Sequence, residues 1–321
     1  MLHLRLMLPT SYTDGVVTML SEHVGVANLA RFDGAAVHPT GDVLSADVAR
    51  ESADEILGWL RGRGIDDVGT ITLETIDTAL SVRARDAEER APGDGSDAVI
   101  WEQVVRTTSA EATPSVTYLA FLTIATILAA CAIVVDSAVL IVGAMVLGPE
   151  FAALAAVCVG TVLRRWDLAR RATLSLIGGF VVAILITTLL AMLTRWAGWI
   201  DAGTISGERV QTGFIVAPDR WSFVVALFAG IAGVLSLTAS KSGALVGVFI
   251  SVTTVPAAGN IALAMALADS SELRSSLIQL TLNIAAILVA GVATLLVQRA
   301  IWRRVPGAAP SFTTPPAGVG R

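Results

Sequence analysis

A proline and a carboxylate stand side by side in the middle of the apolar stretch VGAMVLGPEFAALAAV, residues 142–157. Pro149 interrupts the hydrogen-bond ladder of a helix because it has no N–H, and Glu150 is costly to place in hydrocarbon. Ionisable residues inside a membrane span mark ion or proton pathways by default. The pattern therefore favours a proton or cation site at Glu150. The alternative is a structural helix cap, in which the dipole of the following helix stabilises the charge.

A second proline, Pro256, stands roughly halfway along another long apolar stretch, 243–268. Proline is well tolerated in the first turn of a helix, so each stretch is predicted to consist of two half-helices. The hydroxyl residues that precede Pro256 are expected to cap the second half-helix. Non-helical backbone at this depth must line a cavity or be buried in protein. Both breaks are therefore candidate parts of a substrate or ion path.

Two further polar residues, Asn260 and Asn283, fall within apolar stretches. Hydrogen bonding between helices is their expected role, and lining the path is the second possibility. The full candidate path comprises Gly148, Pro149, Glu150, Ser251, Thr253, Thr254, Pro256, Asn260 and Asn283. Asp136 and Lys241 lie at span boundaries, where an anchoring role is expected.

Catalytic and metal chemistry have no pattern in their favour. The three histidines, His3, His23 and His38, lack the spacing of metal ligands. Cys131 and Cys158 fall in apolar stretches and are expected to be buried small side chains. No Ser-His-Asp set or phosphate loop is present, so no enzyme activity, cofactor or metal is expected. No basic block interleaved with aromatic residues suggests nucleic-acid binding.

The composition indicates a membrane protein. Hydrophobic residues make up 54% of the 321 residues and charged residues only 15%, with a mean hydropathy of +0.72. Each of several apolar segments is long enough to cross most or all of ~30 Å of hydrocarbon. The six segments are 116–135, 138–163, 172–194, 221–238, 243–268 and 277–300. We therefore predict an α-helical polytopic membrane domain with six spans over 115–304, followed by a disordered tail, 305–321.

The distribution of positive charge predicts the orientation. The loops after the second, fourth and sixth spans carry most of it, and all three lie on the side of the N-terminus. Their positively charged residues are Arg164, Arg165, Arg170, Arg171, Lys241, Arg299, Arg303 and Arg304. The positive-inside rule then places both termini in the cytoplasm. The first residues alternate apolar and polar side chains and lack the features of a signal peptide. The expected location is the cytoplasmic (inner) membrane, with the lipid bilayer as partner.

The two halves of the membrane domain show a weak, ordered similarity. VDSAVLIVG at 135–143 corresponds to ASKSGALVG at 239–247, and an in-span proline, an Ala-rich run and a polar loop follow in each half. Three spans per repeat would invert the second copy relative to the membrane. We therefore predict a 3+3 inverted repeat of the kind common in secondary transporters. The alternative is a chance alignment of apolar segments of similar composition.

Residues 1–80 read as a separate soluble domain. Strands are predicted at 2–8, 26–32, 42–48 and 69–76, with a turn at Asp33-Gly34. With two intervening helices the order is β-α-β-β-α-β, the ferredoxin-like split unit. Residues 81–114 are predicted to be a linker with a short juxtamembrane helix. A packing or oligomerisation module, giving a homo-oligomer, is the favoured role, and a small-ligand sensor is the alternative.

Three stretches of the membrane domain carry a family resemblance: DSAVLIVGAMVLGPE, SGALVGVFISVTTVPAAGNIALA and LTLNIAAI. They resemble the prokaryotic "uncharacterised hydrophobic domain" membrane proteins (domain of unknown function 389), over roughly 116–300. Many members have a further proline where Ala153 stands here and a Pro-Pro pair at Val255-Pro256, so milder helix breaks are implied. The resemblance implies a membrane protein and supplies no agreed activity or substrate.

Two functions follow as hypotheses. The first is a transporter or channel-like protein for an unknown small solute or ion, coupled to protons or cations through Glu150. In this case the soluble domain regulates or oligomerises the protein. The second is a non-transporting membrane-anchored sensor or assembly scaffold, in which the bundle is dry and Glu150 is buried against a partner.

Overall fold

The computed structural model describes residues 1–76, 78–93, 95, 98–201, 203, 211–213, 220–238 and 254–302. The chain divides into two compact units, one built mainly on residues 1–102 and the other on the helices that follow. Each unit is described by itself.

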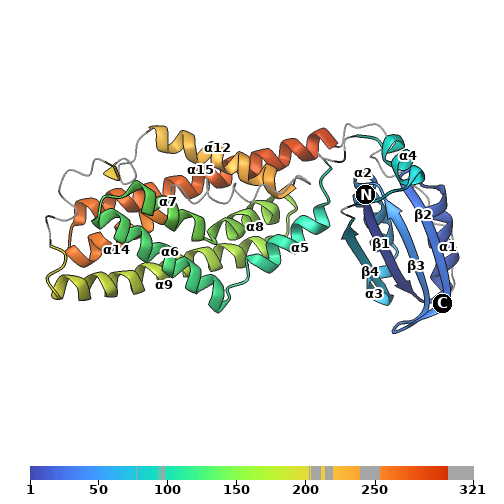
Figure 1. Ribbon diagram of the computed structural model, residues 1–321, viewed down its shortest axis with the longest axis horizontal. Coiled ribbons are helices and arrows are strands. Elements are labelled where there is room, and N and C mark those ends of the chain that lie inside the picture. Colours follow the sequence, from blue (N-terminus) through green and yellow to red (C-terminus); the bar gives the residue numbers. More distant parts are fainter. Residues whose placement is uncertain are drawn as a thin grey trace. The chain divides into compact units, whose positions relative to one another are not determined.

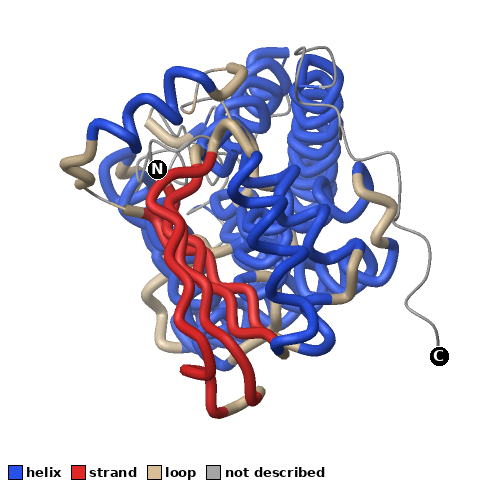
Figure 2. The backbone as a smooth tube through the Cα atoms, turned by 90° about the vertical axis from the view of Figure 1, so that its right-hand side faces the viewer, coloured by secondary structure: helices blue, strands red, loops and turns tan. Residues whose placement is uncertain are grey.

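The N-terminal unit is a four-stranded antiparallel sheet with helices between its strands (Figures 1 and 2). The sheet order is β2-β3-β1-β4, which places β1 and β3 in the centre. The elements are β1 (Leu2–Leu8), α1 (Thr10–Glu22), β2 (Val26–Val37), β3 (Thr40–Val48), α2 (Arg50–Gly62), α3 (Ile65–Val68), β4 (Thr70–Thr75) and α4 (Val82–Arg90). Apart from the short α3 and the added α4, this is the predicted β-α-β-β-α-β order.

The core of this unit comes from the alternation in β1. Leu2, Leu4, Leu6 and Leu8 all point to the helical face of the sheet, and none is more than 2% exposed. They pack against one face of α1 and α2, where the apolar residues recur at helical spacing. Burial of this continuous leucine row, which would be exposed in the unfolded chain, stabilises the unit.

Two predictions for this region were wrong. The Asp33-Gly34 pair does not end β2, which continues to Val37 through a register shift. Gly34 lies at φ +63° and donates its N–H to the Asp42 carboxylate at 2.8 Å, so an irregularity replaces the turn. The predicted linker contains α4, whose first turn is capped by the hydroxyl of Ser81, which accepts from the Ala84 N–H.

The second unit is a bundle of helices (Figure 1). Its described elements are α5 (Trp101–Glu111), α6 (Val116–Val134), α7 (Ala138–Leu147), α8 (Glu150–Val162), α9 (Trp166–Trp196), α12 (Arg220–Thr238), α14 (Val255–Leu267) and α15 (Ser270–Trp302). Among the described residues, four helices are long and apolar enough to cross a membrane: α6, α9, α12 and α15. The bent pair α7 and α8 makes a fifth span if it is counted as one.

The fifth predicted span, 243–268, is described only from Thr254 onward, where α14 forms a shorter apolar helix. The number of six spans therefore stays a prediction. Lys241 and the predicted disordered tail lie outside the described residues, so the predictions for them also stay untested.

Several helices of the bundle end in the same way. A residue in the left-handed conformation follows each of α6, α8, α9 and α14, with φ between +46° and +78°. The N–H of the next residue then reaches back five positions to a carbonyl, as from Arg165 to Gly160 at 2.8 Å and from Asp269 to Ala264 at 2.9 Å. This Schellman arrangement satisfies carbonyls that the helix end leaves open and turns the chain sharply.

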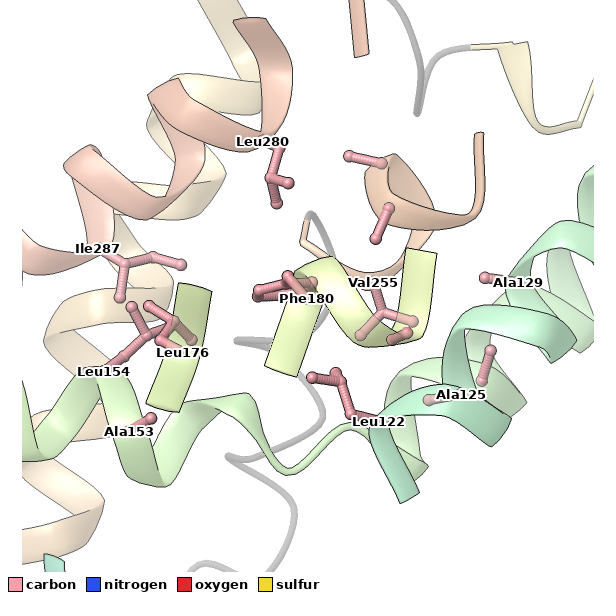
Figure 3. Packing of buried hydrophobic residues seen from close by; sticks show 14 of the residues in the cluster. Leu122, Ala125, Ala129, Ala153, Leu154, Leu176, Phe180, Val255, Leu280 and Ile287 are labelled. Carbon is pink, nitrogen blue, oxygen red and sulfur yellow. The ribbon is translucent and has the colours of Figure 1, made fainter. Parts of the chain in front are cut away.

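Small residues set the spacing of the bundle. A Cβ added at Gly259 of α14 would lie 2.9 Å from the Ala130 nitrogen of α6, and one at Gly230 of α12 would lie 2.7 Å from the Ile287 carbonyl of α15. Larger side chains such as Leu154, Phe180 and Val255 fill the space that remains (Figure 3). Close backbone approach of this kind is the usual basis of helix association in a membrane.

The two cysteines differ in their surroundings. Cys158 is buried against Gly291, as expected. Cys131 is exposed on the surface of α6, so the prediction of burial was wrong for it. Helical periodicity decides the difference, because an apolar helix in a bundle still turns some residues outward.

Candidate functional site

The bend between α7 and α8 lies where the sequence predicts a broken helix. The two helices meet at an angle of 53°. Gly148 is extended at φ −69° and ψ 117°, and Pro149 is the N-cap residue of α8. Pro149 has no backbone N–H, so it cannot continue the hydrogen-bond ladder of α7. The end of the helix at this point therefore leaves no proline donor unpaired. The break therefore follows directly from the Gly-Pro pair.

Glu150 is the first residue of α8 and is fully buried, with 0% of its surface exposed. The position at a helix N-terminus was predicted and is confirmed. The partial positive charge at this end stabilises a carboxylate, because the first N–H groups of the helix point toward it. Such compensation is needed because an ionised group in an apolar core is costly unless it is paired or hydrogen-bonded.

The hydroxyl of Thr254 donates a hydrogen bond to Oε1 of Glu150 at 2.9 Å. Thr254 is also fully buried and immediately precedes α14. The pair therefore joins the starts of two short helices that lie more than a hundred residues apart in the sequence. Residue types alone suggested both residues but not their contact.

One detail at the start of α14 differs from expectation. Thr254 occupies the N-cap position of α14, yet its side chain makes no capping hydrogen bond. It is already in the α-helical region of backbone angles, at φ −92° and ψ −51°, so its hydroxyl turns to Glu150 instead. Pro256 lies within the first turn of α14, as predicted. Ser251 and Thr253 lie outside the described residues.

Asn260 makes the expected contact between helices. Its amide donates to the Glu272 carboxylate and to the Ser276 hydroxyl of α15, both at 2.8 Å. Asn260 and Ser276 are fully buried. The hydrogen bonds fix the turn between α14 and α15, because they tie the middle of one helix to the first turns of the next.

Four polar residues, three of them buried, form a row on α15 that the sequence reasoning recognised only in part. Glu272, Ser276, Gln279 and Asn283 are spaced by four, three and four residues, which places them on one helix face. The last three are each at most 2% exposed, and Glu272 is half-buried. The recurrence of polar residues at helical spacing within an apolar segment is the sequence signal for this row. Of the four residues, only Asn283 was singled out from the sequence.

Tyr118 of α6 is a further buried polar group near Glu150. Its ring lies across Gly179 of α9, where an added Cβ would come within 2.8 Å of the ring. Within the described part of the chain, the buried hydroxyl has no hydrogen-bond partner. The pattern gave no hint of this residue because a tyrosine near a span end is usually an interfacial anchor.

Asp136 follows the C-terminal end of α6 and makes several hydrogen bonds there. Its carboxylate accepts the Thr212 N–H at 2.9 Å and the Thr212 hydroxyl at 2.8 Å. It also accepts the Gln211 N–H at 3.2 Å, and the Gln211 side chain in turn accepts the Ala138 N–H. Asp136 therefore fixes a loop to the start of α7, which agrees with an anchoring role.

No metal centre is found among the residues that the structure describes, because no three His, Cys, Asp or Glu side chains gather closely enough to hold an ion. The arrangement around Glu150 can hold a proton or exchange it, and it can accept a cation if the Thr254 hydroxyl and neighbouring carbonyls complete the ligands.

The long apolar helices, the bent pair and the small-residue packing define a helical protein of the membrane class. Residues 145–289 match a domain of unknown function (DUF389). The chain therefore carries this domain, which confirms the resemblance seen in its sequence and includes both Glu150 and Thr254. No curated protein and no solved structure matches the chain.

Proposed function

We propose that this protein is a transporter or channel-like integral membrane protein, in which Glu150 and Thr254 form a proton or cation site. The supporting observation is the Glu150–Thr254 hydrogen bond, which places a fully buried carboxylate at a break in one apolar helix and against the start of another. Broken helices that present their N-terminal ends to a central site are typical of transporters.

The helical caps favour an inverted repeat as the basis of this site. α8 and α14 each have 13 residues and end in the same left-handed cap, at Arg164 and Ala268. These two residues are 104 positions apart (268 − 164), and so are Glu150 and Thr254. The predicted alignment of 135–143 with 239–247 has the same offset. Equivalent positions touch one another only near a twofold axis, so the pair would lie on the axis relating the halves.

Transport would then couple the charge of Glu150 to the relative position of the two short helices. The ionised carboxylate accepts the Thr254 hydroxyl and is held by the dipole of α8. Protonation, or exchange with a bound cation, weakens the attraction between the starts of α8 and α14. The burial of both side chains supports the assignment of this arrangement to an occluded state of the proposed alternating-access cycle.

We further propose that both termini face the cytoplasm and that the N-terminal unit regulates or oligomerises the membrane domain. The arginines between α8 and α9 support this orientation through the positive-inside rule. Phe32 and Val37 of the edge strand β2 are 52% and 73% exposed, which suits a surface that pairs with a second copy.

The second candidate function is a scaffold or sensor without transport. It is favoured by the complete burial of Glu150 and Thr254 and by the alanine-rich core of the helical unit (Figure 3). In that case the hydrogen bond would only hold α8 and α14 together, and water would not enter the site at any stage of the protein's function.

Cysteine accessibility separates the two functions. In a Cys131→Ala, Cys158→Ala background, single cysteines at Gly148, Ala152 and Ala257 would be treated with a membrane-impermeant thiol reagent from either side. Transport predicts labelling from at least one side at mid-membrane depth. Ala125→Cys, in the buried core of α6, is the matched control and should stay protected.

Ion flux then tests the role of Glu150. Proton or cation entry into liposomes, driven by an imposed potential, should fall at least about tenfold in Glu150→Gln, since the neutral amide cannot exchange a proton. Glu22→Gln, on the exposed face of α1, should leave flux unchanged. Protection of every tested position together with identical flux in both variants would establish the scaffold instead.

A further inference from the structure

A groove runs along α9 on a part of the bundle that the proposed ion site does not use. Its volume is about 610 Å³, within the range of small-molecule sites. One wall is the end of α5 with the chain that leads into α6, from Val105 to Leu119. The other wall is the face of α9 from Asp167 to Val182. Both walls belong to the helical unit.

The interior of the groove is apolar and open. Leu174, Gly178 and Val182 recur every four residues along α9, so they form one stripe of the wall. Leu174 is 60% exposed. A Cβ added at Gly178 would meet no atom within 4 Å, whereas its neighbour Gly179 is packed tightly under Tyr118. The glycine at 178 therefore widens the groove without taking part in helix packing.

The mouth of the groove is charged. Arg165 and Arg171 lie at the N-terminal end of α9 and line it, and Asp167 lines it between them. Arg171 pairs with Asp167 at 3.0 Å, but both side chains are more than two-thirds exposed, so solvent screens the attraction. Two arginines and one aspartate among the lining residues give the mouth a net positive charge.

The dimensions of the groove match one leaflet of a bilayer. From Arg171 to Val182 the helix rises roughly 16 Å at 1.5 Å per residue. This is about half of the ~30 Å hydrocarbon core. A guanidinium at headgroup level and the open apolar groove below it complement an anionic headgroup with its acyl chain. Trp166, 64% exposed beside the arginines, is placed as an interfacial residue usually is.

We propose that this groove binds one anionic glycerophospholipid from the leaflet at the N-terminal end of α9. Arg165 and Arg171 hold the phosphate, and an acyl chain lies along Leu174, Gly178 and Val182. Basic pockets between membrane helices recognise anionic lipids by this combination of charge and shape. The bound lipid would link α5 to the bundle, whatever solute the protein carries.

Lipid retention by the detergent-solubilised full chain tests the proposal. Phosphatidylglycerol and phosphatidylcholine with the same acyl chains would be added separately, and bound lipid counted by native mass spectrometry. We expect retention of phosphatidylglycerol about fivefold or more above phosphatidylcholine, since each basic residue near a lipid surface favours the anion by about that factor. Excess inorganic phosphate should not displace it, because the acyl chain contributes most of the binding.

Matched variants assign the effect to the groove. Gly178→Leu fills the channel and should lower phosphatidylglycerol retention at least about fivefold, while Gly143→Leu, at an equally open glycine of α7, should not. Arg171→Gln should weaken the preference for the anionic lipid about fivefold, and Arg170→Gln, which does not line the groove, should preserve it. Asp167→Asn should strengthen the preference.

Three results would overturn the proposal: equal retention of the two lipids by the unaltered protein, full displacement by phosphate, or the same effect in each variant and its control. If Gly178→Leu fails to fold, the exposed arginine variants decide alone.

Discussion

The two units of this protein bury their side chains in different ways. The N-terminal unit fills its core with large aliphatic side chains, among them Leu4, Leu6 and Ile56. The helical unit fills much of its core with alanine and brings backbones together at Gly230 and Gly259. In water, removal of apolar surface from solvent drives packing. In lipid that drive is absent between helices, so close backbone contact must replace it.

Buried carboxylates show the same contrast. Asp42 in the N-terminal unit accepts hydrogen bonds from the Thr13 hydroxyl at 2.7 Å and the Gly34 N–H at 2.8 Å, and the Arg31 guanidinium lies 3.7 Å away. Glu150 in the helical unit accepts the neutral hydroxyl of a residue on a different helix. Fixed donors and a cation make Asp42 structural. The proposed ion site at Glu150 instead needs groups from the starts of both α8 and α14.

The largest expected effect concerns the leucine core. Leu6→Ala, in a central strand at 0% exposure, should cost the N-terminal unit about 2–5 kcal/mol through lost burial and the cavity that remains. Hydrogen exchange of the β1 and β3 amides in the full chain measures it. Arg5→Ala, on the exposed face of the same strand, should change stability by less than ~0.5 kcal/mol. Equal effects of the two variants would contradict the assigned core face.

The next effect concerns the Glu150–Thr254 pair. Thr254→Val keeps the shape but removes the donor from a buried carboxylate, so we expect a loss of about 1.5–3 kcal/mol. Thermal unfolding of the detergent-solubilised chain, followed through the helical signal, measures the loss. Thr254→Ser retains the hydroxyl and should lie closer to the unaltered protein. A valine variant as stable as the original would show that the hydrogen bond does not hold α8 to α14.

A third effect concerns the small-residue contacts. Gly259→Ala forces a methyl group against the Ala130 backbone of α6 and should cost about 1–3 kcal/mol. Gly143→Ala in α7 meets no atom and should be neutral or stabilising by up to ~1 kcal/mol, because alanine is the better helix former. The unfolding temperature should therefore fall in Gly259→Ala and stay unchanged or rise in Gly143→Ala. A loss at both positions would remove the distinction between packed and open glycines.

The smallest effect at neutral pH is a change in acid sensitivity. The Gly34 amide, followed by the Thr13 hydroxyl, holds the pKa of Asp42 below its ordinary value of 3.8. The stabilisation that ionised Asp42 gives to the folded state is therefore complete at pH values above 3.8, the ordinary pKa. It is lost as the pH falls through the lower pKa of Asp42 in the folded state. Asp42→Asn should remove this part of the acid dependence. Hydrogen exchange of β2 and β3 amides across pH 3–6 tests it, and an unchanged profile in the variant would assign the acid limb to other groups.

Periodicity and residue type predicted a good deal of this architecture. The alternation in 2–8 gave β1 and its buried face, and the Gly-Pro pair gave the bend before Glu150. The continuation of β2 past Gly34 was missed because it depends on a hydrogen bond to Asp42 in another strand. The helix α4 was missed because its sequence is charged and leads into the Pro- and Gly-containing stretch 91–96, a composition that is typical of a linker.

Covalent and local properties are therefore what the sequence determined by itself: which segments are apolar, where proline must break a helix, and that Glu150 starts one. Tertiary structure alone decided which groups meet across the bundle. The Thr254 hydroxyl turned from its own helix to Glu150, Asn260 reached Glu272 and Ser276, and a groove opened at Gly178. The physical reason is that hydrogen-bond partners and voids depend on helix positions in space, and local spacing along the chain does not specify those positions.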